Sequence, residues 1–369
     1  MHASLFFAII MQKILLKSLN IFGFIGKQGS QFWFQANHIK NCLPGDEKMQ
    51  LSRDELLSAY QTMKTIRVFE DRVNQEMGSG DIPGAVHLYA GQEASAVGIC
   101  SLLDSRDQIA STHRGHGHCI AKGCDVPGMM AEIFGKQNGL CLGKGGSMHI
   151  ADLEKGMMGA NGIVGGGPPM ICGAALSAKI LGTKGVAVAF AGDGAFNQGT
   201  TQEALNLASI WQLPVIFAIE DNGFAEATSS EYAVAGDIVQ RAQAYDIASE
   251  KVDGLNFFEV QMAAKSAIER AREGLGPSLL QIKTERYYGH FSGDADTYRS
   301  DEEKSEMRQN KDCLKIFRNK VIGSSLLNDE QLNDIDEKVL ELIDHAVKFA
   351  REGAKPNEED LTKDVYLSY

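Results

Sequence analysis

The sequence has few cysteines and prolines, and its cysteines do not form the pattern of a metal site or a disulfide framework. Of 369 residues, 7 are cysteine and 8 are proline. No two cysteines form a Cys-x-x-Cys pair, which zinc sites and disulfide-rich domains commonly use. The cysteine pattern therefore favours a reducing cytoplasm.

The chain also lacks the charge pattern of a nucleic-acid-binding protein and the apolar run of a membrane span. Its formal net charge is −12 at neutral pH, and it has no arginine-rich run or basic stripe. Nucleic-acid backbones are bound mainly by such basic surfaces. No stretch is long and apolar enough to cross a bilayer. We therefore expect neither nucleic acid nor a membrane among its partners.

The first 48 residues differ in composition from the rest of the sequence. From Met1 to Gly45 there is no acidic residue and no arginine, whereas four lysines and apolar patches such as SLFFAII occur. The apolar stretches are too short for a signal peptide, and the lack of arginine does not match a transit peptide. We interpret residues 1–48 as an upstream extension or a misplaced start, with Met49 opening the chain proper.

Beyond this extension, the pattern predicts an α/β domain followed by helices. Residues 52–78 carry apolar side chains at helical spacing, and Ser52 and Glu55 have the spacing of a capping box. Farther on, short β-rich runs alternate with helical segments; the runs are GVAVAF, PVIFAI and SLLQIK. This alternation predicts a doubly wound, mostly parallel sheet with helices on both faces. We expect residues 49–300 to form this domain and the helical residues 301–369 to pack on it as a tail.

The segment AGDGAFNQGTTQEALNLASIWQLPVIFAIEDN indicates a ligand site. Asp193 lies just past one predicted strand, and Asn222 lies just past the next. Because parallel strands joined by a right-handed crossover end at the same sheet edge, the two side chains can converge. A carboxylate, an amide oxygen and a main-chain carbonyl suit Mg²⁺ or Ca²⁺ rather than zinc, and phosphate oxygens and a water would complete the shell of an octahedral Mg²⁺. The glycines and a helix starting at Asn197 favour phosphate, so we predict a metal-bridged diphosphate.

With further motifs, this segment resembles a known family. From about Leu51 to the C-terminus, the chain is similar to the alpha chain of the thiamine-diphosphate-dependent first component of 2-oxo-acid dehydrogenase complexes. The motifs that carry the resemblance are HLYAGQEA, HRGHG, GKGGSMHI, GANGIVGGG, GDGAFNQG and RYYGH. Within the family, STHRGHGHCIAKG and NGFAEAT resemble the acetoin dehydrogenase branch, in which His113 stands where pyruvate-type chains have tyrosine.

The resemblance implies a set of residues that bind the coenzyme and its metal. Asp193 and Asn222 would bind Mg²⁺ through their side chains, and Phe224 through its backbone carbonyl. The remaining coenzyme-binding positions would be His113 and Arg114 at the diphosphate, Gly162 and Val164 at the aminopyrimidine, and Gly194 and Ala195 through backbone N–H groups.

Three positions of the predicted site depart from the family pattern. Phe224 replaces the usual tyrosine, which matters little if only its backbone carbonyl binds the metal. Asp221 replaces the asparagine of relatives, and the sequence shows no group that offsets its negative charge near the diphosphate. Glu226 stands where several relatives have a bulky apolar side chain that supports the bent coenzyme. What supports the bend in this chain is left open.

Three histidines are candidates for acid–base or substrate roles, because the pKa of free histidine is close enough to neutrality for proton transfer. By the resemblance, His290 and His116 are the acid–base candidates, and His290 also contacts the coenzyme. His87 is a candidate for the substrate pocket. Taken alone, a histidine followed by glycine is better explained by a loop hydrogen bond, and only the resemblance favours a functional role. Cys119 has no base nearby in the sequence, and we interpret it as a packing residue.

The resemblance also implies that the chain works with partners. In this family a separate beta chain supplies the glutamate that activates the coenzyme, which implies an α2β2 heterotetramer. We expect acetoin to be cleaved to acetaldehyde, and a hydroxyethyl intermediate on the coenzyme to acetylate the lipoyl-lysine of a dihydrolipoamide acyltransferase. The alternatives are a pyruvate or other short 2-oxo-acid dehydrogenase and a catalytically silent subunit that binds Mg²⁺ and diphosphate. A P-loop nucleotide-binding protein is disfavoured, because no Gly-x-x-x-x-Gly-Lys-Ser/Thr motif occurs.

Overall fold

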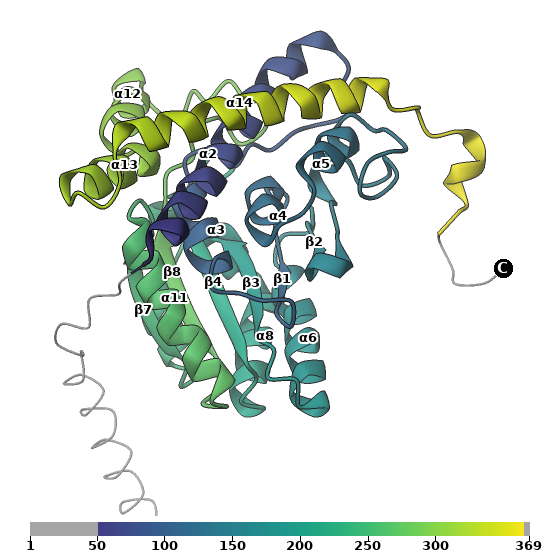
Figure 1. Cartoon of the computed structure of the whole chain (residues 1–369). Helices are drawn as coiled ribbons and strands as arrows, with labels where there is room; N and C mark the ends of the chain where they lie inside the picture. The colour runs from purple at the N-terminus through teal and green to yellow at the C-terminus, as the bar shows by residue number, and fades with distance from the viewer. Residues whose placement is uncertain (1–50, 365–369) are drawn as a thin grey trace, which may run out of the picture. The chain divides into compact units, whose positions relative to one another are not determined.

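A parallel six-stranded sheet forms the centre of the structure, a computed structural model that describes residues 51–364. The interpretation of residues 1–48 lies outside the described residues. The strand order is β2-β1-β3-β4-β8-β7, and every neighbouring pair is parallel (Figure 1). The strands are β1 (Gln108–Ala110), β2 (Met157–Gly159), β3 (Ala187–Gly192), β4 (Val215–Asp221), β7 (Ala248–Asp253) and β8 (Ser278–Lys283). The predicted parallel sheet is confirmed.

Helices cover both faces of the sheet, because its central strands are apolar on both sides. Along β3, Val188 and Phe190 belong to one core cluster, whereas Ala187 and Ala189 belong to the other. Alternate side chains of a strand point to opposite faces, so each cluster marks one face. On the first face lie α2 (Arg53–Glu76), α3 (Glu93–Cys100), α4 (His116–Lys122) and α11 (Phe257–Arg272). On the second lie α6 (Gly167–Leu181), α8 (Gly199–Ile210) and α10 (Ile238–Gln243).

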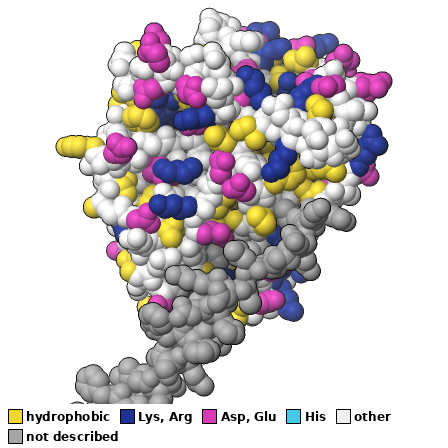
Figure 2. All heavy atoms as spheres, turned by 90° about the vertical axis from the view of Figure 1, so that its left-hand side faces the viewer, with side chains coloured by type: hydrophobic (Ala, Val, Ile, Leu, Met, Phe, Trp, Pro, Cys, Tyr) yellow, Lys and Arg dark blue, Asp and Glu magenta, His cyan; other side chains and the backbone are white. Residues whose placement is uncertain are grey.

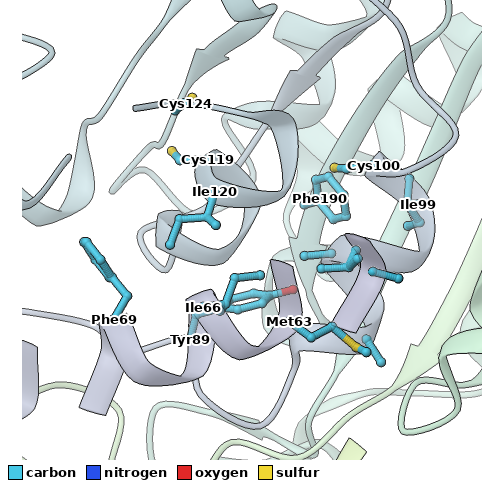
Figure 3. Close-up of a cluster of buried hydrophobic side chains, with 14 of the residues drawn as sticks. Met63, Ile66, Phe69, Tyr89, Ile99, Cys100, Cys119, Ile120, Cys124 and Phe190 are labelled. Atoms are coloured by element: carbon cyan, nitrogen blue, oxygen red, sulfur yellow. The ribbon is translucent and has the colours of Figure 1, made fainter. Parts of the chain in front are cut away.

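The long helix α2 is central to the first core cluster. It begins after the predicted capping box, in which Ser52 and Glu55 each accept a hydrogen bond from the other's backbone N–H group. Met63, Ile66 and Phe69 are fully buried along one side of this helix, and Figure 3 shows Ile66 beside the Tyr89 ring. Burial of side chains this size stabilises the fold by roughly 1.5–3 kcal/mol each.

Two of the C-terminal helices share this core. They are α13 (Cys313–Gly323) and α14 (Asp329–Glu352), whereas Met307 of α12 (Asp301–Asn310) packs in a separate small cluster with Tyr287. Helix α14 runs across α2 and α5 (Val126–Ile133), as Figure 1 shows in yellow. Its buried side chains recur at helical spacing and belong to the first cluster; they are Leu332, Ile335, Val339, Ile343, Ala346, Val347 and Ala350. Helices α13 and α14 therefore complete the core of the α/β domain.

The surface of the described residues is mixed in charge on the face that carries β7. Figure 2 shows acidic and basic side chains interspersed with apolar ones on this face. The edge strand β7 itself carries Glu250 and Lys251, and charged residues on an edge discourage pairing with a further strand. Between residues 51 and 364, no helix has the length and apolar character that a membrane span requires.

The order of the strands determines where a ligand can bind. From β1 the chain continues to β2 on one side, whereas from β3 it continues to β4 on the other side. The carboxyl ends of β1 and β3 therefore border the point at which the direction of the crossovers reverses. In open α/β sheets ligands bind in the crevice at this point. Ser111 follows β1 and Asp193 follows β3 at this edge.

A glycine-rich loop, residues 139–146, is folded around one buried carboxylate. Glu132 of α5 is fully buried, and its oxygens accept hydrogen bonds from four backbone N–H groups at 2.8, 2.8, 2.6 and 3.1 Å, those of Cys141, Gly143, Gly145 and Gly146. A Cβ atom at Gly139 would lie 2.5 Å from a Glu132 carboxylate oxygen, so this position requires glycine. The loop leads directly into Ser147, whose Oγ atom lies 3.0 Å from His116 Nε2, and into Met148, which lines the cavity described below.

We expect Glu132→Gln to lower the free energy of unfolding by about 2–4 kcal/mol, because an amide nitrogen cannot accept hydrogen bonds and leaves buried N–H groups unpaired. Thermal denaturation of the purified protein measures this effect. The matched control is Glu154→Gln at an exposed position, which should change the free energy of unfolding by less than about 0.5 kcal/mol. Equal melting temperatures for the two variants would show that Glu132 does not hold the loop.

Candidate active site

A cavity of about 320 Å³ lies at the carboxyl ends of β1, β3 and β4. It is lined by every residue predicted to bind coenzyme, metal or substrate except His116; these residues are His87, His113, Arg114, Gly162, Val164, Asp193, Gly194, Ala195, Asn222, Phe224 and His290. They come from segments that are far apart in the sequence. The parallel strand order brings these segments to one edge of the sheet.

Asp193 provides an uncompensated negative charge in the cavity wall. Its side chain is 2% exposed, and its Oδ2 atom has no hydrogen-bond partner among the described residues. Burial, and next the nearby Asp221 carboxylate, raise the pKa of Asp193 to about 6. A buried carboxylate without a partner is costly, and a bound cation removes this cost. The position therefore fits the predicted Mg²⁺ ligand.

Asn222 is oriented so that its side-chain oxygen retains a free lone pair. Its Nδ2 atom donates to Gln92 Oε1 at 3.1 Å, and Thr284 Oγ1 donates to the same oxygen at 3.1 Å. The Asn222 Oδ1 atom accepts one hydrogen bond, from Phe224 N at 3.2 Å. An amide oxygen can accept a second interaction, so Asn222 fits a metal ligand beside Asp193.

The negative charge of Asp221, which the sequence left without a counterpart, is balanced from the neighbouring strand. In the β4–β8 pairing Asp221 lies opposite Lys283. Its Oδ2 atom accepts hydrogen bonds from Lys283 Nζ at 2.7 Å and from Gln281 Nε2 at 2.6 Å. The structure thus supplies the compensating group, which belongs to a strand that neighbours β4 in the sheet but is more than 50 residues away along the chain.

Two guanidinium groups form the cationic side of the cavity. Arg114 is 4% exposed and Arg286 is 2% exposed, and both line the cavity. Arg114 donates to the carbonyl oxygens of Leu88 and His290, and Arg286 donates to the carbonyl oxygen of Glu226. Burial, and next Arg286, lower the pKa of Arg114 to about 9. Among the described residues neither group has a carboxylate ion-pair partner, so an anion such as diphosphate fits between them.

The backbone at the end of β3 differs from the prediction in one respect. A helix was expected to start at Asn197, but a short helix, α7 (Asp193–Phe196), starts at Asp193, and α8 follows only at Gly199. The break occurs because Gln198 is extended, with ψ 140°. The N–H groups of Gly194 and Ala195 therefore lie in the first turn of α7. A Cβ atom at Gly194 would lie 2.5 Å from Ala225 Cβ, which explains the glycine.

Three histidine rings lie together at the cavity wall. The ring centroids of His87, His113 and His290 are 4.8, 5.0 and 5.2 Å apart. Burial, and next the Arg114 charge, lower the pKa of His87 to about 3, of His113 to about 2 and of His290 to about 4. All three are therefore neutral at pH 7, and each offers one N–H donor and one lone pair.

The same three histidines have ring nitrogens within 4.8 Å of one another, a spacing that resembles a metal site. The guanidinium of Arg114 lies 3.5 Å from His290 Nδ1, and Arg286 adds a second positive charge. Two neighbouring cations oppose the binding of a third. The cluster therefore suits hydrogen bonding and proton transfer with a substrate more than metal binding.

His116 is not part of the cavity wall. It is fully buried, its Nδ1 atom lies 3.0 Å from a Glu70 carboxylate oxygen, and its Nε2 atom lies 3.0 Å from Ser147 Oγ. With both ring nitrogens engaged, the geometry favours a structural hydrogen bond that ties α4 to α2 and to the glycine-rich loop. Cys119 is also buried, and its contact with Cys124 and its burial raise the pKa of its thiol well above the usual range. This agrees with a packing role.

Several residues of the cavity wall were not predicted from the sequence. Arg286 opens the RYYGH motif and Gln92 lies in HLYAGQEA, so both were visible as members of motifs. Glu220 directly precedes the Asp221–Asn222 pair, and its Oε1 atom accepts hydrogen bonds from Ser95 Oγ at 2.7 Å, His118 Nε2 at 3.2 Å and the Tyr89 hydroxyl. Only the strand pairing shows that these side chains surround one cavity.

We expect Asp193→Asn to stabilise the metal-free protein at pH 7 while abolishing Mg²⁺-dependent coenzyme binding. The folded pKa of about 6 lies above the ordinary 3.8, so ionisation favours unfolding. The free energy of unfolding of the wild-type protein should fall by about 2–3 kcal/mol in total as the pH rises from the unfolded pKa of 3.8 through the folded pKa of about 6. The variant should lack this fall, and the two proteins should converge below about pH 4.

Thermal denaturation across pH 4–7, with and without Mg²⁺ and thiamine diphosphate, measures both effects. The ligands should raise the melting temperature of the wild-type protein and leave that of Asp193→Asn unchanged. Wild-type affinity in the variant would exclude Asp193 as a metal ligand.

Comparison with known proteins identifies the family. Residues 61–359 match the family described as dehydrogenase E1 component. The chain is 57% identical over 322 residues to subunit alpha of the acetoin:2,6-dichlorophenolindophenol oxidoreductase of Cupriavidus necator, covering 87% of this chain and 97% of that protein. The corresponding subunit of Bacillus subtilis is 54% identical, covering 88% and 97%. The pyruvate dehydrogenase E1 component subunit alpha of Rhizobium meliloti is 37% identical, covering 90% and 96%. The chain belongs to the dehydrogenase E1 component family.

Proposed function

We propose that the chain is the alpha subunit of a thiamine-diphosphate-dependent acetoin dehydrogenase. Family membership implies dependence on thiamine diphosphate. The observation that carries the choice of substrate is the difference in identity, 57% and 54% to two acetoin-oxidising relatives against 37% to a pyruvate-type relative. Pyruvate or another short 2-oxo acid is the alternative substrate.

The charges of the cavity wall support binding of a Mg²⁺–diphosphate group. Asp193 Oδ2, Asn222 Oδ1 and the Phe224 carbonyl would hold the cation. Arg114 and Arg286 would hold phosphate oxygens together with the first-turn N–H groups of α7. Gly162 and Val164 would contact the aminopyrimidine end. The coenzyme, when bound, supplies a carbon nucleophile and an electron sink for breaking the bond next to a substrate carbonyl.

The histidine cluster would hold and move protons at the substrate. A neutral ring of His87, His113 or His290 can donate its N–H to the substrate carbonyl and accept the proton of its hydroxyl group. Bound diphosphate would offset the charge of Arg114, which is the second cause of the low histidine pKa values. Their pKa values would then rise towards the range in which imidazole transfers protons at neutral pH.

The rim of the cavity supports a role as one subunit of a larger enzyme. Ile163 is 72% exposed and Val164 is 48% exposed, and both line the cavity. Large apolar side chains at the mouth of a coenzyme site suit burial against a partner. We infer that this partner is a beta subunit, which supplies the activating glutamate in an α2β2 heterotetramer. A lipoyl-bearing dihydrolipoamide acyltransferase would accept the two-carbon unit.

Reduction of 2,6-dichlorophenolindophenol by the complex of this chain with a beta-type chain, in the presence of thiamine diphosphate and Mg²⁺, tests the proposal. Acetoin and pyruvate are offered in parallel at equal concentrations. We expect a higher kcat/KM with acetoin. A higher value with pyruvate would overturn the choice of substrate, and bound coenzyme without turnover of either would favour the catalytically silent subunit.

We expect His290→Ala to keep most of the coenzyme affinity and to lower kcat by about 10²–10⁴-fold, the usual range for a lost general acid or base. The affinity should persist because Arg114 contacts the backbone carbonyl of residue 290, which alanine retains. Fluorescence titration and dye reduction measure the two quantities, with the exposed His345→Ala as control. Unchanged turnover in His290→Ala would remove His290 from the mechanism.

A further inference from the structure

One acidic side chain of the cavity wall stands at a strained position of the backbone. Strands β5 (Phe224–Ala225) and β6 (Thr228–Ser229) pair with Ala225 opposite Thr228. Glu226 and Ala227 therefore form a two-residue hairpin turn. The φ of Glu226 is +56°, which is the left-handed region that favours glycine. A glycine here would relieve the strain, so the side chain of Glu226 needs another reason to be present.

Glu226 is fixed at the cavity, and its charge is not balanced there. It lines the cavity, and Arg286 Nη2 donates to its carbonyl oxygen at 3.1 Å. This hydrogen bond involves the backbone only. The side chain is exposed, and within residues 51–364 no lysine, arginine or histidine pairs with its carboxylate.

The other charges of the wall are engaged once a Mg²⁺–diphosphate group is bound. Asp193 would face the cation, and Arg114 and Arg286 would face the phosphate oxygens. The Glu220 carboxylate already accepts hydrogen bonds from Ser95, His118 and the Tyr89 hydroxyl. The carboxylate of Glu226 then remains an acidic side chain of the wall that has neither a bound cation nor a hydrogen-bond partner among residues 51–364, and it borders the space that a substrate must enter. It would repel an anionic substrate and leave an uncharged one unaffected.

We propose that Glu226 determines substrate class, selecting an uncharged hydroxyketone over a 2-oxo-acid anion by repelling the substrate carboxylate. The inference rests on the proposed function, because acetoin is uncharged and pyruvate is an anion. The rival explanation is that Glu226 supports the shape of the coenzyme through its size. Glu226→Gln separates the two explanations, since glutamine keeps the size of the side chain and removes its charge.

The experiment measures kcat/KM for pyruvate and for acetoin with the complete α2β2 enzyme, by dye reduction at low and high ionic strength. We expect Glu226→Gln to raise the ratio of the pyruvate value to the acetoin value about tenfold, the scale of one like-charge repulsion at a partly exposed site. In the wild-type enzyme, high salt should raise this ratio by screening the repulsion, whereas in Glu226→Gln the ratio should not depend on salt. Glu231→Gln, an exposed neighbour outside the cavity, is the matched control and should leave the ratio unchanged.

Two further measurements do not depend on turnover. Fluorescence titration should give the same Mg²⁺–thiamine diphosphate affinity for Glu226→Gln as for the wild-type enzyme. Glu226→Gly should melt at the wild-type temperature or above, because glycine relieves the positive φ. A lower melting temperature for Glu226→Gly would show that Glu226 contributes to stability and is not retained for selectivity.

The remaining outcomes separate the two proposals. If acetoin is preferred but Glu226→Gln leaves the ratio unchanged, the role of Glu226 is wrong and the proposed function stands. Weaker coenzyme binding by Glu226→Gln would favour the rival explanation. A wild-type enzyme that prefers pyruvate would overturn both proposals, since the carboxylate would then not be repelled.

Discussion

The cavity depends on buried charged side chains that have no ion-pair partner of opposite charge among the described residues. The Oδ2 atom of Asp193, which has no hydrogen-bond partner among the described residues, makes one side of the cavity negative. The guanidinium groups of Arg114 and Arg286 make another side positive. Each costs free energy in the ligand-free chain, and one group, a divalent cation bound to a diphosphate, would satisfy all of them. The neutral histidines follow from this arrangement, because the same arginines and the same burial lower their pKa values.

Helices and strands could be predicted where a short stretch of sequence contains a pattern typical of that element. The capping box before α2 and the run SLLQIK, which coincides with β8, each lie within a few neighbouring residues of the sequence. The ends of β3 and β4 could be placed together because parallel strands allow few connections. Contacts between elements distant in sequence could not be predicted. Lys283 balances Asp221 only through the β4–β8 register, which neither strand specifies alone.

For the site as well, contacts between distant segments could not be predicted from the sequence, as His116 and Arg286 show. His116 shares its motif with His113, but its ring meets Glu70 of α2 and Ser147, and the sequence gives no sign of that packing. Arg286 is one of many arginines until burial and the cavity distinguish it. Residue type suggested the chemistry, whereas burial and direction, which depend on tertiary packing, determine which side chains line the cavity.

Ile163 and Val164 are exposed to solvent and also line the cavity. Whatever surface covers them also closes the cavity, so a ligand held inside and a protein bound outside would share contacts. Their free energies would then be linked, each tightening the binding of the other by the same factor. The quaternary structure of such an enzyme would respond to the supply of its vitamin-derived coenzyme, and dilution of the subunits would release that coenzyme.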